Sequence, residues 1–193
     1  MATNLRSRFA SPPEPVIFRG TGEYSYPVPA TGRYTIIAAG PGGGGSNLVG
    51  GTPQRFWGGG TGAISMAVRT LRYGTRIPVV IGRPGAPMMV RYIWRFQVSG
   101  GTTIVHGVTE NLPWAGGGYG GIHSHIPQNN WDGNDGWADS RMNGLPGQSS
   151  GETPGVTMTG QSFWGQVQLT SGYGGGFTMP GGEGSVLFAY LGP

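Results

Sequence analysis

Clusters of glycine interrupt this chain almost from end to end, and they limit what it can fold into. They lie at residues 42–45, 50–51, 58–60, 100–101, 116–118, 120–121, 174–176 and 181–182. Each glycine costs up to ~1 kcal/mol in lost backbone freedom relative to alanine. So many glycines should be retained for geometry, because glycine lets backbones approach closely and adopts positive φ. Most clusters directly precede or follow a predicted strand, which argues against a flexible linker between domains.

The remaining composition is that of a folded chain. The 41 glycines and 16 prolines among 193 residues would alone suggest disorder. However, 36% of the residues are hydrophobic, 11% are aromatic and only 10% are charged. Disordered chains are poor in aromatic residues and rich in charge, because they cannot bury enough apolar surface to offset chain entropy. We therefore expect one folded domain with a core of its own.

Between the clusters, apolar and polar residues alternate with the period of two that indicates β-strands. Residues 34–39 are apolar or small on both faces, which predicts a central strand. In residues 77–81, Pro78 predicts an edge strand or a bulge. Similar alternation occurs at 64–68, at 90–98, at 186–190, and at Phe163, Val167 and Leu169 opposite Gln166 and Gln168.

No segment keeps helical spacing over three turns, so the pattern predicts an all-β sandwich or barrel. We expect a jelly-roll-like β-sandwich of short strands with long glycine-rich loops. Several glycine runs side by side could also pack as polyglycine-II-like helices, with backbone groups bonded between neighbouring runs.

The chain divides into an arm and a domain. Residues 1–15 are polar and contain Pro12, Pro13 and Pro15, which predicts an extended arm. This arm is either a frayed terminus or a tether onto a neighbouring subunit. Residues 16–193 form a single glycine-rich β domain with a variable, aromatic loop region at about 106–160.

Four aromatic residues in that loop region lie among polar and glycine residues: Trp114, Tyr119, Trp131 and Trp137. One interpretation is that the rings fold back as a satellite core over the glycines. The other is an exposed receptor-binding surface, since aromatic side chains provide contact area at a low entropy cost.

His123 and His125 are the candidate metal ligands. In a strand, residues two apart point to the same side, so both imidazoles could face one ion. Two ligands are too few for a metal site in a monomer. In a trimer, three pairs would supply six nitrogens for a transition metal on the threefold axis. The alternative is two polar loop histidines without a ligand.

Two catalytic motifs occur in unsuitable contexts. Residues 58–63 match the dinucleotide signature G-x-G-x-x-A, but a period-two strand follows instead of the required helix. Ser149 matches G-x-S-x-G, but Pro146 and Pro154 bracket it where a strand-to-helix turn is needed. We find no credible catalytic triad and expect a protein that is not an enzyme.

Charge and targeting signals narrow the function further. All 12 positive charges are arginines, the net charge is +4, and the arginines are scattered, which does not favour a nucleic-acid partner. The first residues lack the apolar core of a signal peptide, and no apolar run is long enough for membrane insertion. The chain has no cysteine, so neither disulfides nor thiolate metal sites support the fold.

The serial order of these features resembles the glycine-rich domain of bacteriophage tail proteins, from about residue 20 to 193. The segments that carry the resemblance are GTGEYSYPVPATGRYTIIAAGPGGGGS, then FWGGGTGAISMAVRTLRYGTRIPVVIGRPGAP, then SGGTTIV followed by AGGGYGG, and finally GGGFTMPGGEGSVLFAYLG. The insertion RYIWRFQV and residues 122–160 depart from the family pattern, so any specificity is expected there.

The resemblance implies a non-enzymatic virion protein of a tail tip or tail fibre, made in the host cytoplasm without a signal peptide. Such proteins are often multimeric, and we expect a homo-oligomer with a trimer favoured. The implied partners are other tail proteins, through residues 1–15, and a host cell-envelope glycan or protein. Some phage fibres bind metal along a threefold axis through His-x-His pairs, which is the family precedent for His123 and His125. The alternative is a purely structural virion component, such as a tail or capsid subunit, a cap or a decoration, without receptor binding.

Overall fold

The computed structural model describes residues 11–48, 55–86, 88–90, 95–96, 103–105, 114–115, 123–124, 153–176 and 179–193. These ranges contain strands and no helix, so the predicted all-β class is confirmed for them. Within the same ranges, no helix long and apolar enough to cross a membrane occurs. The strands are β1 (Val16–Arg19), β2 (Gly22–Pro27), β3 (Gly32–Ala39), β4 (Ser46–Leu48), β5 (Arg55–Trp57), β6 (Ile64–Leu71), β7 (Arg76–Ile81), β8 (Met88–Val90), β9 (Arg95–Phe96), β10 (Thr103–Val105), β11 (Trp114–Ala115), β12 (His123–Ser124), β13 (Thr157–Ser162), β14 (Gly165–Thr170) and β15 (Ser185–Gly192).

The main sheet is antiparallel and has the order β1-β15-β3-β6. The predicted strand at residues 34–39 is β3, and its position between β15 and β6 confirms that it is central. Tyr34 and Ile36 face one hydrophobic cluster, while Ile37 faces another, so both faces of β3 are buried. This explains why the segment has no polar face in the sequence.

A second antiparallel sheet has the order β11-β10-β7-β2. Its strands β2 and β7 share one core cluster with β3 and β15 of the main sheet. The rings of Tyr26 and Phe188 stack across this core with centroids 4.1 Å apart. Because β7 lies between β2 and β10, the prediction of an edge strand at Pro78 is wrong, and the continuous register between β7 and β2 has no bulge there. Pro78 is accommodated because the described pairing with β10 involves only Val79 and Val80.

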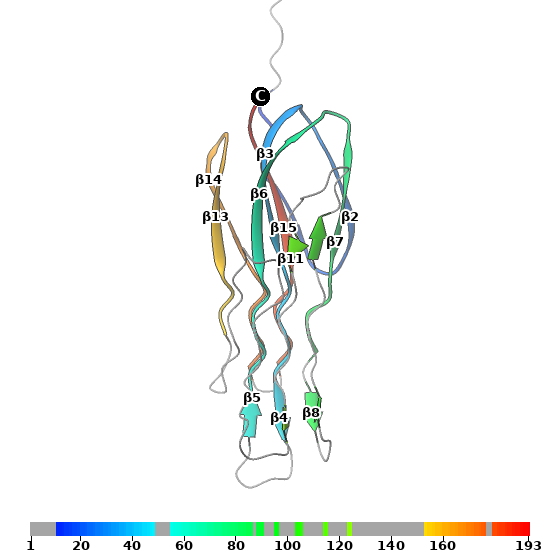
Figure 1. Ribbon diagram of the computed structural model, residues 1–193, viewed down its shortest axis with the longest axis vertical. Helices are drawn as coiled ribbons and strands as arrows, with labels where there is room; N and C mark the ends of the chain where they lie inside the picture. Colours follow the sequence, from blue (N-terminus) through cyan, green and yellow to red (C-terminus); the bar gives the residue numbers. More distant parts are fainter. Residues whose placement is uncertain are drawn as a thin grey trace, which may run out of the picture.

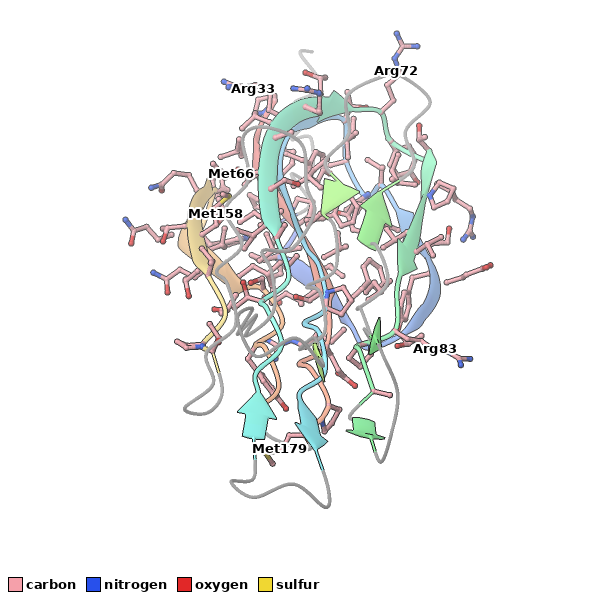
Figure 2. The ribbon with its side chains drawn as sticks, turned by 60° about the horizontal axis from the view of Figure 1, so that its bottom comes forward. Arg33, Met66, Arg72, Arg83, Met158 and Met179 are labelled. Carbon is pink, nitrogen blue, oxygen red and sulfur yellow. The ribbon has the colours of Figure 1, made fainter. Side chains whose placement is uncertain are left out.

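The opposite face of the main sheet is covered by the β13–β14 hairpin, which belongs to the second cluster. The hydroxyl of Thr35 donates to the carbonyl oxygen of Gln161 at 2.7 Å. Gly160 allows this close packing, since a Cβ there would lie 2.7 Å from Cγ2 of Thr35 and 3.2 Å from Sδ of Met66. Figure 2 shows Met66 beside Met158 on this side of the molecule.

Below the two sheets, five runs of chain lie side by side (Figure 1). We call residues 40–45, 58–63, 82–86, 172–176 and 179–184 the glycine layer. Run 40–45 is bonded through its backbone to each of the other four runs.

The bonds within the glycine layer repeat every three residues. Gly42 and Gly45 donate to Gly182 and Met179, at 2.8 and 3.0 Å. Likewise, Gly59 donates to Gly175 at 2.7 Å, and Gly62 donates to Gly172 at 2.8 Å. A helix of three residues per turn has this repeat.

The layer uses glycine for close approach and not for positive φ. Among the described glycines, positive φ occurs at positions 20, 22, 74, 165 and 192, all outside the layer. Inside the layer, a Cβ on Gly42 would lie 1.7 Å from the carbonyl oxygen of Tyr173, and one on Gly174 would lie 1.7 Å from that of Gly59. At these two positions the neighbouring backbone leaves no room for a side chain.

The described strands give the molecule two distinct ends. The main sheet and the C-terminus lie at one end, and β4, β5 and β8 lie at the other, beyond the glycine layer (Figure 1). Arg33 and Arg72 lie at the first end and Met179 at the second (Figure 2). The register of β1 runs from Arg19 opposite Ser185 to Val16 opposite Phe188, so β1 starts opposite the middle of β15 and pairs with the N-terminal half of that strand. We call the end with the main sheet and the C-terminus the terminal end, and the end with β4, β5 and β8 the distal end.

Candidate attachment surfaces

Trp114 lies in β11, where its backbone pairs with Ile104 of β10. Strands β10 and β11 lie against β3 of the main sheet, and β11 also lies against β6. The backbone of Trp114 is therefore positioned over the main sheet, well away from the distal strands. This position is that of the Trp114 backbone, and both interpretations of the aromatic side chains stay predictions.

His123 lies in β12, which pairs with β9 so that His123 is opposite Phe96. Strand β12 lies against β4, at the distal end. Trp114 and His123 therefore belong to different sheets and are not brought together. His125, Tyr119, Trp131 and Trp137 lie outside the described residues.

The described part of the chain has no group of three His, Asp or Glu residues that could hold a metal ion. A shallow polar groove on the surface is lined by Arg19, Gln168, Leu169, Thr170, Glu183, Gly184 and Ser185. It combines one cation and one anion with amide and hydroxyl groups. The described lining contains no histidine.

The hairpin tip carries exposed aromatic residues that the sequence did not single out. Phe163 and Trp164 form the connection between β13 and β14, with exposed fractions of 53% and 55%. The expectation that Phe163 lies on the same face as Val167 and Leu169 is wrong, because the chain turns at Phe163. The sequence does contain a signal for this hairpin: two segments of alternating polar residues, separated by Phe163, Trp164 and Gly165.

Three of the glycine runs connect directly to the strands at the distal end. Runs 40–45 and 82–86 lead into β4 and β8, and β5 leads back into run 58–63. The distal end therefore contains the strands that flank residues 49–54, and it contains the start of the segment from 91 onward. Strands β4, β5 and β8 are therefore connected directly to hydrogen-bonded backbones of the glycine layer.

No protein-family model matches the chain, and no curated protein matches it. What the chain does must therefore be inferred from its residues and its geometry.

Proposed function

We propose that this chain is a non-enzymatic structural protein of a bacteriophage tail tip or fibre and that it contributes to host-surface attachment. The observation that carries the proposal is the separation of the two ends by the glycine layer. A protein that joins a particle at one end and contacts a surface at the other needs such a spacer. The serial order of hairpin, glycine run, paired strands and closing strand supports the same class of protein.

The proposed architecture is a jelly-roll-like β-sandwich continued by a polyglycine-II-like bundle. The shared cluster between β2–β7 and β3–β15 supports the sandwich, and the three-residue repeat of backbone bonds supports the bundle. Each glycine run continues a strand, so the bundle extends the rigidity of the sheets. This rigidity would let distal loops be presented without a flexible linker.

We assign receptor binding to the aromatic loop region, with Trp131 and Trp137 as its strongest candidates. A tryptophan ring stacks on sugar faces and packs against protein surfaces at low entropy cost. Strand β12, within this region, lies against β4 at the distal end, which supports a distal position for part of the region. The position of β11 over the main sheet makes Trp114 a weaker candidate.

The experiment is binding of the purified full chain to cells of the host bacterium. Trp131→Ala or Trp137→Ala should weaken binding by at least about tenfold, as expected for a binding hot spot, without lowering the thermal midpoint. Tyr73→Ala is the matched control, because this exposed ring lies between β6 and β7 at the terminal end. Unchanged binding by both tryptophan variants would contradict the aromatic recognition surface.

The second candidate is a purely structural virion component whose loops contact neighbouring subunits. It is favoured by the contact between the N-terminal arm and Trp164, since an arm fixed to the domain suits an assembly role. In this case, changes in residues 1–15 should reduce incorporation into particles, and the free protein should not bind cells. Counting chains per particle with and without the arm changes separates the two functions.

A homotrimer with a transition metal between the His123–His125 pairs is part of the proposal for the assembled protein. Sedimentation of the purified protein measures its oligomeric state. Elemental analysis of that oligomer should find metal, and His123→Ala should remove it. An oligomer without bound transition metal would eliminate this site.

A further inference from the structure

The tip of the β13–β14 hairpin presents two aromatic rings that its turn does not require. Two-residue hairpin connections ordinarily use glycine, asparagine or aspartate, whereas this one uses Phe163 and Trp164. The neighbouring residues hold the turn: Ser162 Oγ donates to the carbonyl oxygen of Gly165 at 2.8 Å, and Gly165 supplies the positive φ of 117°. The two rings are therefore free to serve a surface role.

The hairpin tip is fixed on the terminal end of the domain. The amide of Phe163 donates to the carbonyl oxygen of Tyr190 at 2.6 Å. The rings of Phe163 and Trp164 meet edge to face, with centroids 5.5 Å apart and an interplanar angle of 79°. Their geometry is set by the hairpin and the end of β15, so a ligand meets a preformed aromatic pair.

Residues 11–15 of the N-terminal arm contact this pair through Trp164. The indole N–H of Trp164 donates to the carbonyl oxygen of Pro13 at 3.2 Å. Pro12, Pro13 and Pro15 are partly buried, whereas Ser11 and Glu14 are exposed. The two exposed positions are three residues apart, the period of a polyproline II segment that keeps one side against its support.

We infer that the hairpin tip is a binding site for an extended, proline-containing peptide segment, and that residues 11–15 of the same chain are its occupant. Aromatic-lined surfaces bind such segments because proline is already ordered, so little entropy is lost on docking. The indole N–H selects a backbone carbonyl, which every extended peptide offers, and the prolines supply the packing. The site also fixes the end at which the chain before Ser11 joins the domain.

This site does not depend on the proposed attachment to a host. A failure of Trp131→Ala to change cell binding would leave it intact. The loss of arm docking would in turn leave the distal recognition surface intact.

Fluorescence quenching in the full chain tests the site. The protein has no cysteine, so Ser11→Cys provides a single thiol for a dye that tryptophan quenches on contact. The labelled parent should be strongly quenched. Pro13→Gly keeps Trp164 as the quencher but loosens the arm, so the undocked fraction should rise about two- to fivefold, because the undocked chain gains conformational freedom. Trp164→Ala should abolish quenching, and the control Tyr73→Phe should leave it unchanged.

Two results would overturn the inference. The first is equal quenching in the parent and in a Trp164→Ala variant whose urea midpoint shows that it is folded. The second comes from mixing a labelled Trp164→Ala chain with unlabelled parent. Quenching should stay absent in the mixture, and its return would place the arm on another copy instead of its own hairpin.

Discussion

The amide of Gly42 donates to the carbonyl oxygen of Gly182 at 2.8 Å, joining two glycine runs from opposite parts of the chain. On another side of Gly42, the carbonyl oxygen of Tyr173 lies only 1.7 Å from where a Cβ would be. Gly42 therefore combines a bond to one run with close contact to another. At such positions the glycine layer requires glycine because there is no space for a Cβ, and not because glycine is flexible.

Gly42→Ala should destabilise the protein by about 3 kcal/mol or more, because two backbones must separate and lose hydrogen bonds. Urea unfolding of the purified variant measures this loss. The control is Gly74→Asn, since Gly74 has a positive φ of 78° but no atom within 4 Å of a built Cβ. Asparagine tolerates this conformation, so the control should cost less than about 1 kcal/mol. Equal losses of unfolding free energy in the two variants would show that lack of space for a side chain is not the reason for glycine at position 42.

The strands could be predicted because their signal is local. Tyr34, Ile36 and Ile37 show that both faces of one strand are buried before any partner is known. The pairing of glycine runs could not be predicted, because glycine has no side chain to indicate which neighbour or which register a run prefers. The edge-strand prediction from Pro78 was wrong because a missing N–H affects only one side of a strand at one position. A flanking strand can still pair with the neighbouring residues.

Gly160→Ala should push the hairpin away from the main sheet and cost about 1–3 kcal/mol, because the new methyl group meets Cγ2 of Thr35. Thr35→Ser removes that methyl group but keeps the hydroxyl that donates to Gln161. The double variant should therefore recover at least half of the loss, as a coupled pair in direct contact does. Strictly additive losses in a double-mutant cycle would argue against this contact.

Alkaline pH should destabilise the fold through its buried tyrosines. Burial raises the pKa of Tyr26, with a further rise from its neighbour Tyr34, and burial also raises the pKa of Tyr34. The unfolded chain loses these protons near pH 10, whereas the folded chain retains them. Stability is therefore full below about pH 10 and falls above it, by up to ~1.4 kcal/mol per pH unit for each group.

Urea unfolding at several pH values measures this slope. Tyr26→Phe removes one titrating group, so the stability of the variant should fall less steeply with pH than that of the parent. Identical slopes would mean that Tyr26 does not retain its proton in the folded chain.

The candidate site was less predictable than the fold. Composition drew attention to Trp114 and His123, but it could not show that β11 lies over the main sheet while β12 lies against β4. Those positions depend on pairing with β10 and β9, which are too short to leave a clear pattern in the sequence. Phe163 and Trp164 were missed because an aromatic pair in a tight turn resembles the end of a strand.

Hydrogen exchange of the backbone amides is the most direct test of the central claim, that the glycines form a bonded support and not loops. The amides of Gly42, Gly43, Gly59, Gly62, Gly172 and Gly175 all donate to neighbouring runs. They should be protected to an extent comparable with the amides of β3 and β15, since bonded and buried amides exchange only through opening of the structure. Exchange of these glycine amides as fast as in an unstructured peptide would contradict the account.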